Sequence, residues 1–195
     1  MYTDFYIFRH GETDNNLKRI WQGSQLNPPL NDKGRQQARQ IIPCIADYRL
    51  EILYASPLRR AAETAEIANS IANLPIIIKP DLRECNFGAA EGLTFEQLQL
   101  QFPDLLPQIT YPNQQNWHLS FPGHGSESKQ AVSERFIKTL LQIAQGKERR
   151  IGIFSHCGAM SAVLCRLSVF NRPIPNCGIL HIRYEHETEQ FKFIA

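Results

Sequence analysis

Short apolar runs that end at charged or small residues are the feature of this sequence that most constrains its fold. Residues 5–8, Phe-Tyr-Ile-Phe, are typical of a short buried strand, and Gly11 predicts the turn that ends it. Arg9 and His10 then lie at the carboxyl end of the strand, where open α/β sheets bind ligands. A guanidinium offers a planar fork of donors that fits phosphate or carboxylate. From this pair alone, an anion site and an ordinary core histidine beside a surface arginine are equally open.

Further strands and helices alternate along the chain. Apolar runs at 51–55, 74–79, 149–155, 179–184 and 190–194 predict strands. Apolar spacing and N-cap residue types predict helices that begin near Lys33, at Ser56-Pro57, at Thr94, at Ser126 or Ser128, and at Ala159. Pro43 predicts a break in the first of these helices, and 14–30 is expected to be a polar loop. The alternation predicts one layered α/β domain over residues 1–195.

The stretch from 103 to 125 is long for a connection within a compact domain. It carries four of the twelve prolines, and such loops are usually lids or unstructured segments. Its aromatic residues, among them Trp117 and Phe121, favour a lid-like insertion that forms a wall for the substrate. A local hydrophobic cluster is an equally good interpretation.

Composition excludes several classes of protein. Hydrophobic residues make up 43% and charged residues 21%, as in ordinary globular proteins, and a net charge of +2 gives no basis for nucleic-acid binding. Asp4 and Arg9 interrupt the first apolar run, so no signal peptide is expected. No run approaches the roughly 20 apolar residues of a membrane span, so a cytoplasmic location is expected. The five cysteines form no C-x-x-C pair, which argues against a disulfide framework or a zinc site.

Other chemically capable residues also follow strands or begin helices. Arg60 and its neighbour Arg59 lie in the first turn of a predicted helix, where the helix dipole disfavours cations unless an anion is close. Glu84 follows the strand at 74–79. His156 directly follows the strand at 149–155 and precedes a helix whose free N–H groups favour anions. A solvated arginine pair and a surface carboxylate paired with Arg83 are the simpler alternatives.

Together with Arg9 and His10, these residues suit phosphoryl transfer. Two arginines and a protonated histidine could hold the phosphoryl oxygens, while a neutral His10 could attack phosphorus and form a phosphohistidine. A protonated Glu84 could give the leaving oxygen its proton and then deprotonate the water that frees the histidine. Because side chains supply the positive charge, such a site needs no metal ion or other cofactor.

Five segments with these residues stand in one order along the chain. They are Arg9-His10-Gly11-Glu12-Thr13 with Asn16, Pro29-Leu30-Asn31-x-x-Gly34-x-x-Gln37-Ala38, Ser56-x-Leu58-x-Arg60-Ala61-x-x-Thr64-Ala65, Leu82-x-Glu84 with Gly88-x-x-Glu91-Gly92, and Ser155-His156. In order and spacing the set resembles the signature segments of the histidine phosphatase superfamily, also called the phosphoglycerate mutase-like superfamily. The resemblance covers nearly the whole chain.

The resemblance implies a three-layer α/β/α sandwich around a mixed, mostly parallel sheet. It also implies roles for eight residues: His10 as nucleophile, Arg9 and Arg60 as phosphate ligands, Glu84 as proton donor, His156 as second catalytic histidine, and Asn16, Gly23 and Cys157 as substrate contacts. Cys157 stands where the family commonly has glycine, so it could narrow the pocket or make the site sensitive to oxidation. The segment 123–128 resembles the family's P-G-G-E-S segment with a shifted residue, and no catalytic role is carried onto it.

Members of this family divide into phosphatases and phosphoglycerate mutases. The mutases are longer, with segments that exclude water, and this chain has only 103–125 available for that purpose. We therefore expect a phosphatase that acts on a small phosphorylated metabolite, with a cofactor-dependent phosphoglycerate mutase and a non-catalytic phospholigand-binding module as alternatives. Relatives are often dimers, so the resemblance is compatible with a homodimer, and the sequence itself does not give the oligomeric state. The short branch includes phosphatases of α-ribazole phosphate, phosphoserine and sugar phosphates, and the sequence leaves the substrate unnamed.

Overall fold

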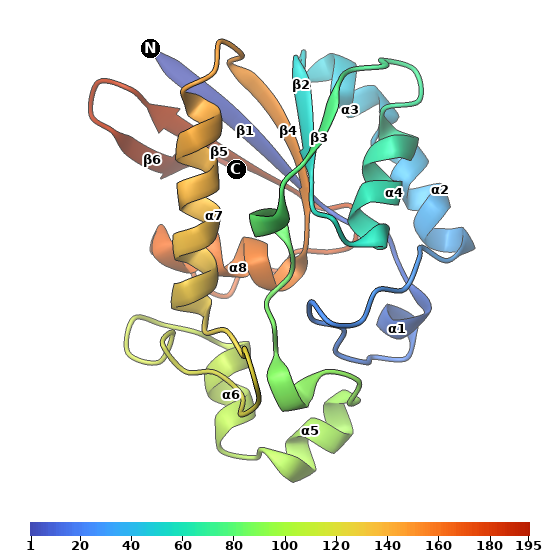
Figure 1. Cartoon of the computed structure of the whole chain (residues 1–195), viewed down its shortest axis with the longest axis vertical. Helices are drawn as coiled ribbons and strands as arrows, with labels where there is room; N and C mark the ends of the chain where they lie inside the picture. Colours follow the sequence, from blue (N-terminus) through green and yellow to red (C-terminus); the bar gives the residue numbers. More distant parts are fainter.

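The computed structural model describes residues 1–195, whose strands form one six-stranded sheet in the order β3-β2-β4-β1-β5-β6 (Figure 1). The strands are β1 (Tyr2–Arg9), β2 (Ile52–Ala55), β3 (Ile76–Ile78), β4 (Arg150–Ser155), β5 (Ile179–Glu185) and β6 (Gln190–Phe193). The pairs β3–β2, β2–β4 and β4–β1 are parallel, and β5 and β6 continue the sheet in antiparallel pairing. The predicted mixed, mostly parallel sheet is confirmed.

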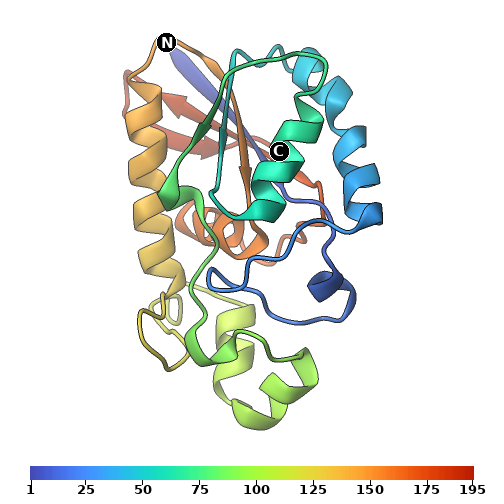
Figure 2. The same cartoon turned by 45° about the vertical axis from the view of Figure 1, so that its right-hand side comes forward.

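Alternating side chains of the central strands bury both faces of this sheet. Phe5 and Ile7 of β1 point to the face covered by α7 (Lys129–Ala144) and α8 (Cys157–Arg166). Tyr6 and Phe8 point to the other face, under α2 (Asp32–Gln40), α3 (Ile42–Asp47) and α4 (Arg59–Ala68). In Figure 2, α7 lies on one side of the sheet and α2 and α4 lie on the other. The expected three-layer α/β/α sandwich is therefore confirmed.

Several helix boundaries differ from those expected. The chain breaks between α2 and α3 at Ile41, next to Pro43 as predicted, and Ser128 rather than Ser126 caps α7. Ser56 does not cap α4, because that helix begins at Arg59 with Leu58 as its N-cap. The polar stretch after β1 is also not all loop, since Thr13 caps a short helix, α1 (Asp14–Leu17), through a capping box with Asn16.

A small cap of helices lies beyond the carboxyl ends of the parallel strands. Figure 1 places α5 (Phe95–Gln101) and α6 (Leu105–Thr110) there, and two short 3₁₀ turns, η1 (Pro80–Leu82) and η2 (Gly88–Ala90), lead toward them. Part of the 103–125 stretch is thus helical, and Leu106, Ile109 and Phe121 are buried in the main core. Through these side chains the segment packs against the rest of the domain.

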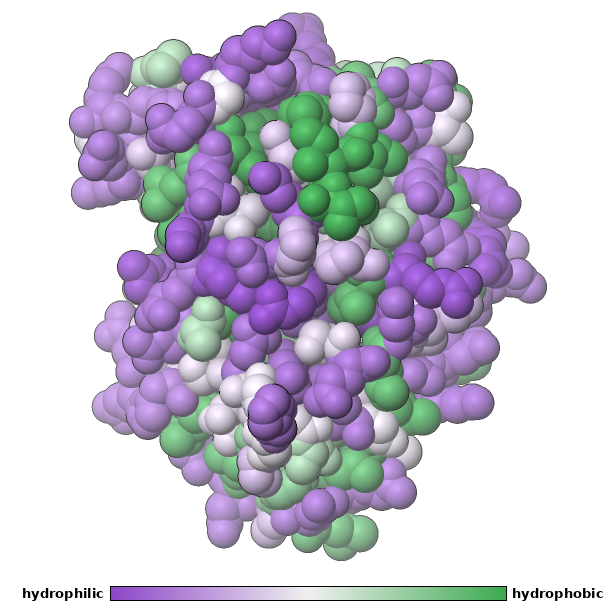
Figure 3. Space-filling model, viewed as in Figure 1, coloured by the Kyte–Doolittle hydropathy of each residue, from purple (hydrophilic) through white to green (hydrophobic).

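The surface is mostly hydrophilic on the face shown in Figure 3, apart from an apolar area over the region of β2 and β3. Ile77 and Ile78 of the edge strand β3 are among the exposed large apolar side chains. None of the helices combines the length and the apolar character needed to cross a bilayer.

Candidate active site

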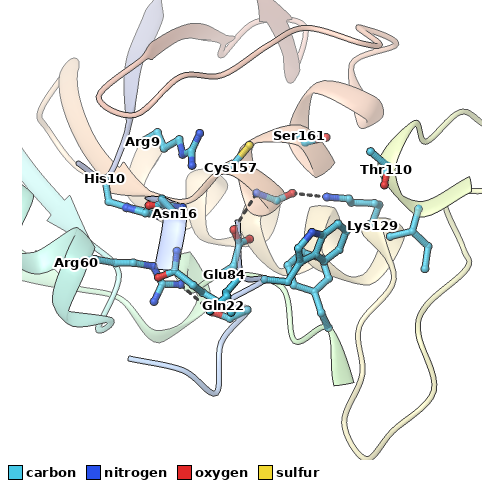
Figure 4. A pocket seen from close by; sticks show the side chains of 16 residues that line it. Arg9, His10, Asn16, Gln22, Arg60, Glu84, Thr110, Lys129, Cys157 and Ser161 are labelled. Atoms are coloured by element: carbon cyan, nitrogen blue, oxygen red, sulfur yellow. Dashed lines mark hydrogen bonds between the residues drawn. The ribbon is translucent and has the colours of Figure 1, made fainter. Parts of the chain in front are cut away.

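A pocket of about 300 Å³ lies at the carboxyl edge of the sheet (Figure 4). Of the predicted site residues, those that line it are Arg9, His10, Asn16, Gly23, Arg60, Glu84 and Cys157. His156 is the exception, since it is fully buried and lies next to His10, with 5.2 Å between the ring centroids. The structure thus gathers residues from the whole length of the chain at one edge of the sheet.

Strand register brings the two histidines together. Arg9 of β1 pairs with Ser155 of β4, so the next residue of each strand is a histidine at the same sheet edge. The backbone N–H of His10 donates to the carbonyl of Ser155 at 3.0 Å. Gly11 follows the end of β1, and its φ is not positive, so a left-handed backbone does not explain the glycine. A Cβ there would lie 2.5 Å from the carbonyl oxygen of Gly34, so packing against the start of α2 requires glycine.

His10 is held as a neutral imidazole with one free nitrogen. Burial, followed by the positive charges of Arg60 and Arg9, holds the pKa of His10 well below its usual value of 6.5. Its Nδ1 lies 2.7 Å from the carbonyl oxygen of Gly11, which only accepts, so Nδ1 carries the proton. Nε2 therefore keeps its lone pair, as a nucleophile requires.

The ring of His156 is held in place by Ser56, which lies just before α4 in the sequence. Its Nε2 lies 2.7 Å from the hydroxyl of Ser56, which also accepts from the N–H of Leu58. The hydroxyl can donate to Nε2, which leaves the proton on Nδ1, and this buried Nδ1 has no partner. Burial, followed by the charge of Arg60, lowers the pKa of His156 well below 6.5. Ser56 thus orients a histidine instead of capping a helix.

The two arginines present unpaired donors beside His10. Arg60 is 1% exposed, and its Nη1 and Nη2 donate to the carbonyls of Leu26 (2.9 Å) and Gly23 (2.7 Å). Nη1 of Arg9 donates to the carbonyl of Ile174 at 2.7 Å. The Nε atoms of both arginines are buried without a partner. Burial lowers the pKa of Arg60 to about 10, so it stays charged at neutral pH. Buried unpaired cationic donors of this kind suit an anion.

Glu84 lies at the N-terminus of α8 and is the only carboxyl group that lines the pocket. Its Oε1 accepts from the N–H groups of Cys85 and Ala159 at 2.8 Å, and its Oε2 accepts from that of Gly158 at 2.9 Å. A Cβ on Gly158 would lie 2.5 Å from Oε1, so glycine leaves the room that this carboxylate needs. Three backbone donors therefore fix the position of Glu84.

An ion-pair network holds the loop that carries Glu84. Arg135 of α7 donates to the carbonyls of Asp81, Arg83 and Glu84 and to the carboxylate of Glu127, whose Oε2 also accepts from the N–H of Asn86. The segment 123–128 thus has a structural role in this chain, because its Glu127 anchors the loop at 81–86.

The remaining expected substrate contacts reach the pocket in different ways. Asn16 is tied to α1 by its capping box and to Asn176, whose Nδ2 lies 3.4 Å from its Oδ1. Gly23 has a φ of +54°, and a Cβ there would overlap the carboxylate of Glu91, so only its backbone lines the wall. Cys157 begins α8, and its thiol is 4.0 Å from the carbonyl of Ile174.

The apolar wall of the pocket comes from residues that the sequence did not indicate. From the 103–125 segment Ile109 and Thr110 line it, whereas Trp117 and Phe121 do not, which corrects the expectation for these two aromatic residues. Instead Trp21 and Phe87 form the wall, with ring centroids 4.8 Å apart, and the buried Phe121 packs edge-on against Trp21. Further lining residues that the sequence did not single out are Ile20, Gln22, Lys129, Gly158 and Ser161. The available signal for some of them is proximity, since Ile20, Trp21 and Gln22 lie in the sequence between Asn16 and Gly23, and Gly158 follows Cys157.

No three His, Cys, Asp or Glu side chains come together in a group that could hold a metal ion.

The two buried histidines predict a stability that depends on pH. Because their pKa values are lowered on folding, the unfolded chain binds more protons below about pH 6.5, and stability falls as the pH falls through that value. Between pH 7.5 and 5.5, each histidine should cost about 1.4 kcal/mol of unfolding free energy. Urea denaturation at both pH values, on wild type and His10→Asn, measures this. In His10→Asn the unfolding free energy should fall by only about half as much as in wild type. His118→Asn, at an exposed histidine, should show the full decrease. Equal decreases in all three proteins would contradict the lowered pKa of His10.

Comparison with known proteins places this pocket in a family. The model of the histidine phosphatase superfamily (branch 1) matches residues 5–195. The uncharacterized phosphatase PhoE of Bacillus subtilis is 33% identical over 163 residues, which are 83% of this chain and 76% of that protein. The adenosylcobalamin/alpha-ribazole phosphatase of Escherichia coli is 28% identical over 163 residues, 83% of this chain and 77% of that protein.

The fold is shared with solved structures as well. A mycobacterial glucosyl-3-phosphoglycerate phosphatase superimposes with a TM-score of 0.85 at 22% identity, over 99% of this chain and 98% of that one. Since the family match spans nearly the whole sequence, the chain belongs to branch 1 of the histidine phosphatase superfamily.

Proposed function

We propose that this protein hydrolyses phosphomonoesters of small metabolites through a phosphohistidine formed on His10. The observation that carries the proposal is the environment of His10: a neutral imidazole whose Nδ1 proton is fixed by the carbonyl of Gly11, beside the buried unpaired donors of Arg9 and Arg60. Family membership and the phosphatase names of the relatives support the same reaction class.

In the first step, Nε2 of His10 attacks phosphorus, and the bond between phosphorus and the leaving oxygen breaks. Arg9 and Arg60 stabilise the charge on the non-bridging oxygens, because backbone carbonyls already hold both guanidinium groups in place. His156, whose unpaired Nδ1 belongs to a ring next to that of His10, is assigned to the same oxyanions. Glu84, the only carboxyl group of the pocket, is assigned to deliver a proton to the leaving oxygen.

In the second step, water attacks the phosphohistidine and the phosphorus–nitrogen bond breaks. Glu84, ionised after the first step, accepts the proton of this water and returns to its starting state. Inorganic phosphate leaves, and His10 is again neutral. Each proton in the cycle passes through Glu84, so the reaction needs only residues that line this pocket and His156, which is next to His10.

The proposal predicts a trappable covalent intermediate. Rapid mixing with a radiolabelled phosphomonoester, followed by an alkaline quench, should leave acid-labile phosphate on the protein, and mass spectrometry should place it on His10. Turnover in excess EDTA should continue at the same rate, since positive charge comes from side chains. Label on another residue, or full loss of activity in EDTA, would contradict the proposal. Conversion of 3-phosphoglycerate to 2-phosphoglycerate without free phosphate would instead identify a mutase.

A further inference from the structure

Lys129 is a buried cation that takes no part in the proposed reaction at His10. It is 7% exposed, lines the pocket, and forms no ion pair with any carboxylate; its Nζ donates only to the carbonyl of Gly158, at 3.1 Å. It is also the first residue of α7, where the helix dipole disfavours a positive charge. A buried ammonium in such a position needs an anion to offset its cost.

Two hydroxyl groups line the same pocket. The Oγ1 of Thr110, at the end of α6, is buried and has no hydrogen-bond partner in the protein. Ser161, one turn into α8, lines the pocket with it. An ammonium group and hydroxyl donors are the groups that hold a carboxylate or a second phosphate. The ring of Phe87, with its centroid 5.7 Å from Nζ, makes a cation–π contact with this ammonium and leaves its N–H donors free for an anion.

This end of the pocket is separate from the end that holds His10. Figure 4 shows Arg9, His10 and Arg60 on one side, Lys129 and Thr110 on the other, and Glu84 between them. Because Glu84 is assigned to protonate the leaving oxygen, whatever lies beyond it is part of the leaving group. Arg9 and Arg60 already match the two charges of a phosphoryl group, so Lys129 is a third cation that the phosphoryl group does not require.

We propose that Lys129, with Thr110 and Ser161, binds an anionic substituent on the leaving group. The substrates would then be small phosphorylated acids, or bisphosphates, instead of neutral alcohols bearing one phosphate. This inference rests on the proposed phosphatase activity and adds its substrate class. The anion can be a carboxylate or a second phosphate, since both suit one ammonium and two hydroxyls.

Matched substrate pairs test the inference on the wild-type protein. 3-Phosphoglycerate and glycerol 3-phosphate differ only by a carboxylate in place of a CH₂OH group, and propane-1,3-diyl bisphosphate and 3-hydroxypropyl phosphate differ only by the second phosphate. We expect kcat/KM to favour the anionic member of at least one pair by about tenfold or more, as a charged hydrogen bond provides. The pair that shows the preference identifies the anion. A ratio near or below one in both pairs would overturn the inference.

Replacement of Lys129 tests whether this residue recognises the anionic substituent. In Lys129→Met the preference should fall to within a fewfold of one, whereas Lys129→Arg should keep part of it. Lys138→Met is the matched control, because Lys138 is an exposed lysine on the same helix outside the pocket, and it should retain the wild-type ratio. If Lys129 only anchors Gly158, both members of a pair would lose kcat/KM equally and the ratio would not change. Should Lys129→Met fail to fold, Thr110→Val should still lower the ratio severalfold, and an unchanged ratio there would count against the subsite.

Failure of this inference can be told apart from failure of the proposed function. If neither these compounds nor p-nitrophenyl phosphate releases phosphate, the phosphatase proposal fails. Calorimetric binding of the same pairs to wild type and Lys129→Met then still decides whether Lys129 selects an anion. If all substrates turn over at similar kcat/KM, the phosphatase proposal stands and only the anionic subsite is wrong.

Discussion

Replacing His10 with alanine should lower phosphate release by at least about 10,000-fold, because the change removes the proposed nucleophile and leaves only the binding groups. The loss should be in kcat for every phosphomonoester, and the alkaline-stable phosphoryl label should disappear with it. Steady-state phosphate release, measured beside the trapping assay, checks both effects. The pocket loses one buried ring whose only side-chain hydrogen bond is to Gly11, so the fold should survive.

The control for this variant is the same change at a histidine outside the pocket. His118→Ala removes an exposed imidazole on the 103–125 segment and should leave kcat within about twofold. Phosphate release by His10→Ala close to the wild-type rate, with the protein folded by circular dichroism, would rule out the phosphohistidine mechanism.

Arg60→Lys should lower kcat/KM by about 100- to 1,000-fold even though it keeps the charge. The guanidinium fork uses Nη1 and Nη2 to hold Leu26 and Gly23 while Nε remains free beside His10, and one ammonium cannot do both. The inhibition constant of inorganic phosphate should weaken in the same variant, since phosphate needs the same donors. Measuring both quantities separates loss of an anion contact from a purely structural defect.

The neighbouring residue supplies a matched control. Arg59 is exposed, and its backbone N–H, not its side chain, donates to Asn27. Arg59→Lys should therefore stay within about twofold of wild type in kcat/KM and in phosphate inhibition. Equal effects of the two substitutions would mean that Arg60 has no special contact with the phosphoryl group.

The strands and most helices followed from local pattern alone. Residues 5–8 and 151–154 are apolar on both faces because they lie in the middle of a sheet covered on both sides, and Thr94 and Ser128 cap helices as their residue types predict. The boundaries that were wrong depended on distant residues. Ser56 has the right local chemistry for an N-cap, yet its hydroxyl is engaged by His156, 100 residues later.

The residues of the pocket also differ in whether local sequence or contacts between distant residues identify them. Arg9, Arg60 and the two histidines lie at strand ends or helix starts, which sequence can locate, whereas Glu84 lies on the loop between η1 and η2. Trp21 and Phe87 could not be found that way, because they are far apart in the sequence and contact each other only in the folded chain. Lys129 begins α7, and only its burial distinguishes it from other polar residues at helix starts.

The sequence by itself determined the order of elements, the family, and the residues that can carry phosphoryl chemistry, because strand and helix patterns and the Arg9-His10 and Ser155-His156 segments are local. Only the tertiary structure decided which nitrogen of His10 is free, that the buried ring of His156 lies next to it, and that Lys129 lines the pocket without a counter-ion. These properties arise from burial and from hydrogen bonds between residues far apart in the chain, and both exist only once the sheet and its covering helices have assembled.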